Sequence, residues 1–167
     1  MKYLLWSLVA LVVLVGLMML IGYLLPVAHT ASRDALIAAP AADVFATIRD
    51  VARYPDWWSD ISRVELLTAD GGRVRFREHM SSGPVVMEVE QTTAPSRFVT
   101  RIADPDQPFG GTWTFELAAA GSGTRVTITE RGEVYNPIFR FMSRFIFGYT
   151  GTMESCLAAL TRKFHKP

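Results

Sequence analysis

The sequence has only one cysteine, Cys156, and its three histidines, His29, His79 and His165, lie far apart along the chain. A single thiol cannot form an intramolecular disulfide, and no group of Cys and His residues has the spacing of a metal site. Nucleotide-binding glycine-rich loops and a nucleophile-elbow serine are missing as well. The sequence therefore indicates no metal and no cofactor, and Cys156 is expected to be a small apolar residue in a helix.

An excess of charge is also missing from the part of the chain beyond residue 25. All 16 acidic residues and all but one of the 17 basic residues lie there, the exception being Lys2. Nucleic-acid binding requires a net basic surface, and this part is formally neutral. We therefore expect no nucleic acid as the main partner.

Charge is wholly absent from the run Leu4 to Leu25. A helix of that length reaches about 33 Å, enough for the roughly 30 Å hydrocarbon core of a bilayer. A cleaved signal is the alternative, but its apolar region is usually about 7–15 residues long, and His29 spoils the cleavage pattern before Ala31. The run predicts a single-pass anchor, with Lys2 and the amino terminus in the cytoplasm and the rest of the chain extracytoplasmic.

The remainder has the size of one ordinary domain. We predict a transmembrane anchor at 1–27, a linker at 28–33 and a folded domain at 34–167. A first strand at 32–38 and two short helices after Pro40 precede six strands joined by turns such as Asp70-Gly71-Gly72. An apolar stripe at helical spacing then predicts one long helix over 136–164.

This order predicts an α+β fold in which a curved antiparallel sheet of about seven strands wraps around the long C-terminal helix, a helix-grip arrangement. One face of such a sheet is polar and the other packs against the helix. The space between sheet and helix commonly forms a cavity for a small apolar ligand.

Three segments carry a resemblance to a known family: Ile37 to Phe45, Tyr54-Pro55-Asp56-Trp57, and Gly123 to Thr127 entering the last strand. Together with the closing helix, they resemble the START/Bet v 1-like (SRPBCC) superfamily, which includes polyketide cyclase/dehydrase-like proteins. The resemblance implies the helix-grip fold and a ligand cavity. It implies no particular activity, because carriers, lipid-transfer domains and cyclases share the fold and no common catalytic motif can be carried over.

Two carboxylates are candidates for acid/base chemistry in that cavity. Strand alternation places Glu78 on the face of Phe76, and Glu130 on the face of Ile128. Burial raises the pKa of a carboxyl group, which is how general acids and bases are made. The alternative is that a strand irregularity turns either carboxylate outward, or that Arg101 neutralises it.

The inner face of the predicted sheet and the apolar stripe of the predicted closing helix supply the residues expected to line the cavity. They are Phe76, Met87, Arg101, Trp113, Phe115, Ile128, Tyr149 and Met153. On the opposite face, Arg75 and Arg77 are expected to form a charge ladder with Glu88 and Glu90.

Two functions fit this pattern. The preferred one is a membrane-tethered binding module for a hydrophobic small molecule or lipid, and the aromatic segment 135–149 would meet the membrane surface or gate the cavity. The alternative is a cyclase/dehydrase-like enzyme that uses Glu78 or Glu130 as acid/base and Arg101 or Tyr135 to orient the substrate. The sequence leaves the oligomeric state open.

Overall fold

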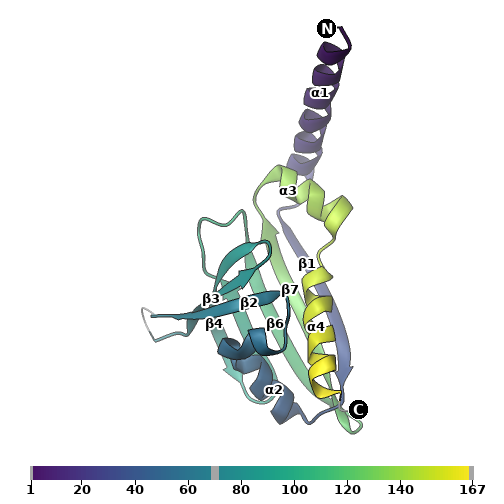
Figure 1. Cartoon of the computed structure of the whole chain (residues 1–167). Helices are drawn as coiled ribbons and strands as arrows, with labels where there is room; N and C mark the ends of the chain where they lie inside the picture. The colour runs from purple at the N-terminus through teal and green to yellow at the C-terminus, as the bar shows by residue number, and fades with distance from the viewer. Residues whose placement is uncertain (1, 69–71, 166–167) are drawn as a thin grey trace.

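A computed structural model gives the arrangement of residues 2–68 and 72–165, shown in Figure 1. The turn expected at Asp70-Gly71 lies outside the described residues. All neighbouring strands pair antiparallel in one seven-stranded sheet of order β1-β7-β6-β5-β4-β3-β2. The strands are β1 (Ala28–Ile37), β2 (Ile61–Leu67), β3 (Arg75–Met80), β4 (Gly83–Thr93), β5 (Arg97–Ile102), β6 (Phe109–Ala120) and β7 (Gly123–Val134). The predicted α+β helix-grip fold is confirmed.

The first strand is longer than the sequence pattern predicts. Residues 28–33, expected as a linker, are the first part of β1 and pair with β7, beginning with Ala28 opposite Glu133. The Ser32 hydroxyl reinforces this pairing by donating to the Ile128 carbonyl at 3.0 Å. The pairing partners are about a hundred residues apart in sequence, so local composition does not reveal them. The sheet therefore begins almost directly after the N-terminal helix.

Two short helical segments follow β1 and cover one end of the sheet. Helix α2 (Ala41–Arg49) begins after Pro40, with Asp43 in its first turn, where a negative charge favours the helix dipole. Its apolar side, Val44, Phe45 and Ile48, is buried. The 3-10 helix η1 (Val51–Asp56) then leads into β2.

The single C-terminal helix predicted over 136–164 is wrong. The structure has α3 (Pro137–Met142), the π-helical turn η2 (Ser143–Phe147) and α4 (Gly151–Phe164). The break lies at Gly148, whose φ of 73° and ψ of −175° are incompatible with helix continuation. At the other end, the Asn136 side chain caps α3 by accepting from the N–H groups of Ile138 and Phe139. Because of the break, α4 packs on the sheet while α3 lies beside the N-terminal helix (Figure 1).

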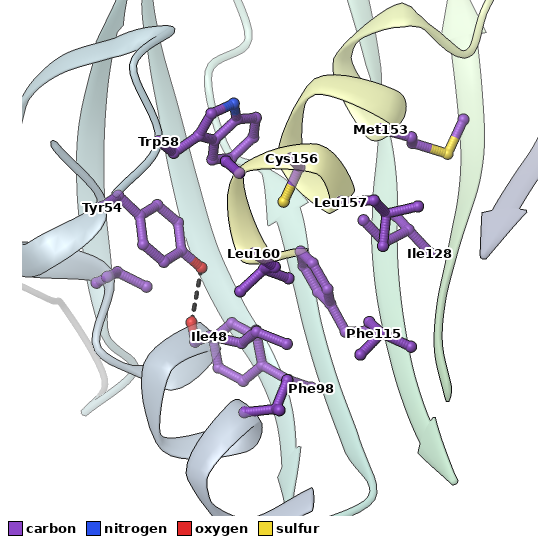
Figure 2. Packing of buried hydrophobic residues seen from close by; sticks show 14 of the residues in the cluster. Ile48, Tyr54, Trp58, Phe98, Phe115, Ile128, Met153, Cys156, Leu157 and Leu160 are labelled. Carbon is purple, nitrogen blue, oxygen red and sulfur yellow. Dashed lines mark hydrogen bonds between the residues drawn. The ribbon is translucent and has the colours of Figure 1, made fainter. Parts of the chain in front are cut away.

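Buried apolar side chains fill the space between α4, α2 and the sheet (Figure 2). Leu160 and Cys156 of α4 meet Phe98 of β5 and Ile48 of α2, and all four are at most 1% exposed. The Tyr54 hydroxyl donates to the Ile48 carbonyl at 2.7 Å, which satisfies a polar group inside this cluster.

Helix α1 (Lys2–Leu24) projects away from the domain (Figure 1). It has a mean hydropathy of 2.9 in its most apolar window, and none of that window is buried. A core helix would be buried, so the length and composition fit a membrane span or an N-terminal signal sequence.

The end of α1 is held against α3. Gly22 is buried, and a Cβ there would lie 1.9 Å from the Pro137 carbonyl oxygen, so only glycine allows this approach. The guanidinium of Arg140, 6% exposed, donates to the carbonyl oxygens of Gly22 and Leu25 at 3.0 Å each. It also donates to the carbonyls of Val134 and Tyr135 at 2.9 Å. One side chain thus joins α1, α3 and the end of β7.

Candidate functional site

A cavity of about 750 Å³ lies between the sheet, the α3–η2 segment and the first turn of α4. Strands β3 to β7 supply most of its wall, the η1 region supplies Tyr54 and Trp58, and β1 supplies His29. The surface inside is largely apolar. Five of the eight predicted lining residues do line it: Phe76, Met87, Trp113, Phe115 and Tyr149.

The other three predicted lining residues lie elsewhere. Ile128 and Met153 are fully buried in the packed core beside the cavity. Arg101 points to the outer face of the sheet, where it donates to Glu90 at 2.8 Å and to Glu88 at 3.1 Å. Its neighbours Thr100 and Ile102 line the cavity, so the period-two alternation of β5 turns Arg101 outward. The prediction for Arg101 as a cavity group is therefore wrong.

The outer face carries a ladder of charges close to the one expected. Glu88 accepts from Arg73 at 2.9 Å and from Arg101, and Arg75 lies 3.8 Å away. The hydrogen bond from Arg73 is the main reason that the pKa of Glu88 lies below its usual value. Arg77, expected to meet this ladder, instead donates to Glu65 of β2 at 3.2 Å.

Glu78 of β3 is buried in the cavity wall, at 8% exposure. Within the part of the chain that the structure describes, no ion pair or hydrogen bond holds its carboxylate, and desolvation raises its pKa to about 7. Burial, with the nearby Glu78 charge as a smaller cause, raises the pKa values of Tyr54 and Cys156 well above normal. Glu78 is therefore a carboxyl group in the cavity wall that can exchange a proton around neutral pH.

Glu130 of β7, the second candidate acid/base residue, differs from Glu78 in that its carboxylate is hydrogen-bonded. One carboxylate oxygen lies 2.9 Å from Nε2 of His29, and the other accepts from Trp113 Nε1 at 2.7 Å. The His29 ring stacks on Tyr149, with centroids 3.8 Å apart and an interplanar angle of 23°. These four side chains come from β1, β6, β7 and the turn before α4, and all of them line the cavity.

His29 is a site residue that sequence reasoning missed. The composition around it indicates a linker, whereas it is the second residue of β1, directly opposite Gly132 of β7. A Cβ at Gly132 would lie 2.3 Å from Cε1 of His29, so the glycine leaves the space that the imidazole occupies. An alternating pattern extended upstream through 28–31 was the available signal.

Tyr135, a candidate for orienting a substrate, is half exposed, and its hydroxyl donates to Glu133 at 2.8 Å. Across residues 2–68 and 72–165, no group of three or more His, Cys, Asp or Glu side chains is placed to hold a metal ion. The arrangement offers a largely apolar chamber whose wall includes the isolated carboxylate of Glu78 and the hydrogen-bonded carboxylate of Glu130.

The sequence model of the family described as polyketide cyclase / dehydrase and lipid transport matches residues 28–165. The chain belongs to this family. The matched region begins at the first residue of β1 and leaves out helix α1. No curated protein sequence matches the chain closely enough to count as a relative.

Solved structures of the same fold come from several bacteria. A START superfamily protein from Mycobacterium smegmatis has a TM-score of 0.64 at 18% identity, covering 81% of this chain and 97% of its own. A protein from Thermus thermophilus has a TM-score of 0.66 at 23% identity, with coverage of 81% and 97%. The Zhui aromatase/cyclase from Streptomyces sp. R1128 has a TM-score of 0.64 at 13% identity, with coverage of 81% and 93%. At these identities the likeness concerns the fold.

Proposed function

We propose that this member of the polyketide cyclase / dehydrase and lipid transport family is a membrane-tethered binding module that holds a hydrophobic small molecule or lipid in its cavity. The observation that carries the proposal is that the α3–η2 segment both lines the cavity and packs against helix α1, and we take this side of the cavity as its mouth. Phe139, Ser143 and Phe147 of the α3–η2 segment line the cavity, and the same segment packs against the end of the apolar helix α1. A membrane that holds α1 therefore lies next to the mouth.

The surface of the mouth has the chemistry of a membrane interface. Phe145, Ile146 and Phe147 of η2 are 59%, 60% and 70% exposed, with the exposed Arg144 beside them. Exposed aromatic and aliphatic side chains grouped around a basic residue favour insertion at the headgroup boundary. An apolar ligand then passes between bilayer and cavity without crossing water. As predicted from Lys2, we place the amino terminus in the cytoplasm and the domain on the opposite side, which a topology reporter fused after Pro167 tests.

Uptake of a fluorescent fatty acid from phosphatidylcholine vesicles by the full chain in nanodiscs tests the proposal. We expect uptake by the wild type, and a roughly three- to ten-fold loss of affinity in Phe147→Ala, because part of the apolar surface at the mouth is removed. Leu36→Ala is the matched control, since Leu36 is 57% exposed on β1 and does not line the cavity. Failure of the wild type to take up the fatty acid, together with no lipid in its native mass spectrum, contradicts the proposal.

The environment of Glu78 favours a second candidate function. A buried carboxyl group with a pKa of about 7 is suited to general acid/base catalysis of the cyclase/dehydrase type. Screening aromatic polyketide-like substrates for turnover tests it, with Glu78→Gln and Glu130→Gln as variants. Unchanged turnover in both variants rules out this mechanism.

A further inference from the structure

Acidic side chains outnumber basic ones in the wall of the cavity. Among the described residues, no lysine or arginine lines the cavity, although the whole chain has 17 basic and 16 acidic residues. The imidazole of His29 is the lining group in this part of the chain that can become positively charged. A cleft lined by charges of one sign attracts ligands of the opposite sign and repels those of the same sign. The carboxylates in the wall are those of Asp60, Glu78, Glu130 and Glu133.

Three of these carboxylates have hydrogen-bond partners inside the protein. Asp60 accepts from a serine hydroxyl of α4, and Glu133 accepts from the hydroxyl of Tyr135 at 2.8 Å. Glu130 accepts from the indole N–H of Trp113 at 2.7 Å. Each of the three therefore keeps at least one hydrogen bond when the cavity holds no ligand.

The fourth carboxylate, that of Glu78, has no hydrogen-bond partner within the described part of the chain, although the residue is only 8% exposed. Its side chain points to the cavity, because it shares a face of β3 with Phe76 and Met80, which also line the cavity. Neither of its oxygens is among the inaccessible side-chain atoms that lack a partner in the described residues. The oxygens are thus unpartnered but accessible, so a ligand in the cavity can reach them.

The surroundings of Glu78 in the described structure supply no positive charge. Its cross-strand neighbours are Val64 of β2 and Val85 of β4. The charge of Glu78 raises the pKa values of Tyr54 and Cys156 further, so both stay neutral around pH 7, and the Tyr54 hydroxyl donates to a backbone carbonyl instead. A buried carboxylate without a partner costs free energy, which a cation placed beside it offsets.

We propose that the cavity selects hydrophobic molecules that carry a cationic amine, with the carboxylate of Glu78 as the counterion of the ammonium group. This inference rests on the proposed binding function and specifies the ligand. An ammonium group only donates hydrogen bonds and a carboxylate only accepts them, so the two match. Aromatic faces add to the attraction, because the ring quadrupole stabilises a nearby cation. The aromatic residues of the wall include Tyr54, Phe76, Trp113 and Phe115.

The test compares three probes that share one apolar skeleton and differ in charge: 1-naphthylmethylamine, 1-naphthalenemethanol and 1-naphthoate. Calorimetry at pH 7 on the full chain in uncharged detergent micelles should rank the affinities in that order, after subtraction of a titration into empty micelles. In Glu78→Gln, the ratio of amine to alcohol affinity falls roughly ten-fold or more, because the charge-assisted hydrogen bond is lost while the amide oxygen still accepts from the alcohol. Glu116→Gln removes an outer-face carboxylate paired with Arg97, and as the matched control it leaves the ratio unchanged.

Proton release provides a second readout, which a purely structural role of Glu78 does not produce. Burial raises the pKa of Glu78 to about 7, so the group is about half protonated at pH 7. An ammonium ligand favours the carboxylate, so amine binding should release up to about half a proton from the wild type, and alcohol binding should release none. Calorimetry in two buffers of different ionisation enthalpy measures the release, and Glu78→Gln abolishes it. Amine binding without proton release contradicts the role of Glu78 as the counterion.

The outcomes separate this inference from the proposed function. If the wild type binds amine and alcohol equally well, or if Glu130→Gln lowers the amine preference as much as Glu78→Gln does, the role of Glu78 is wrong and the binding function stands. Uptake of the fatty acid without binding of the amine has the same meaning, since a fatty acid can enter by its chain and leave its carboxylate at the mouth. If the wild type binds no probe and takes up no fatty acid, both proposals fail. Circular dichroism of each variant verifies that the domain is folded.

Discussion

The two ends of the domain are built from the same strands and differ in how they are filled. The packed end, around Ile48, Phe98 and Leu160, contains interlocked apolar side chains (Figure 2). The open end, between α3–η2 and the sheet, encloses about 750 Å³ and places Glu78 and Glu130 in its wall. One sheet thus supports a solid core and a chamber side by side.

The packed end stabilises the fold, whereas the open end contains features that serve ligand binding and lower stability. Close packing at the packed end contributes favourable apolar burial. The open end includes a desolvated carboxyl group, an imidazole nitrogen of His29 that has no hydrogen-bond partner among the described residues, and exposed aromatic side chains, each of which lowers stability. Substitutions at the packed end should therefore change the free energy of unfolding more than they change ligand affinity. Substitutions at the open end should change ligand affinity more, and some of them should increase stability.

The largest effect is expected for Leu160→Ala at the packed end. Leu160 is 0% exposed, so the substitution leaves a cavity and lowers the free energy of unfolding by about 2–5 kcal/mol. Urea denaturation of the full chain in detergent measures this loss. Leu66→Ala on β2, where Leu66 is 63% exposed, is the control and changes stability by roughly 0.5 kcal/mol or less. If folded Leu160→Ala binds the fatty acid much more weakly than the wild type does, the division into two ends is wrong.

Glu78→Gln should have the next largest effect, and it depends on pH. Burial raises the pKa of Glu78 from about 4.5 to about 7, so the folded state binds its proton more tightly than the unfolded state does. This group's contribution is fully present below about pH 4.5 and is lost as the pH rises through 7, a change of about 3 kcal/mol. Glu78→Gln removes that loss and should be more stable than wild type at about pH 8.

Chemical denaturation at several pH values measures the difference between this variant and wild type. The difference should grow between about pH 4.5 and pH 7 and then level off. Glu116→Gln, on an outer-face carboxylate paired with Arg97, is the control without such a trend. A constant difference between Glu78→Gln and wild type at all pH values shows that Glu78 is not desolvated.

Much of the fold follows from the sequence because a strand with one buried face shows apolar and polar residues in alternation. The alternation from Arg73 to Met80 predicts Glu78 on the cavity side, where the structure places it. The position of Glu130 is predicted on the same ground. These predictions depend only on local spacing, which a strand preserves.

The parts that failed depend on information that is not local. The apolar pattern continues through 142–149, so it predicts an unbroken helix, but several of those side chains are exposed at the cavity mouth and Gly148 breaks the helix. His29 is a site residue only through pairing with β7, roughly a hundred residues away. Placing Arg101 required knowing which alternate residues of β5 face the cavity, and the loop that follows the strand makes that assignment ambiguous from the sequence.

The smallest effect is expected where the open end joins α1. Arg140→Met removes the hydrogen bonds to the carbonyls of Gly22 and Leu25, and we expect a loss of about 1.5–3 kcal/mol confined to this junction. Hydrogen exchange should then speed up in α3 and the last turn of α1, while α4 stays protected. Arg144→Met, exposed on η2, is the control and leaves exchange unchanged. If Arg140→Met keeps the protection of α3, then contact between Gly22 and Pro137 alone holds the mouth against α1, and the Arg140 side chain does not orient the cavity.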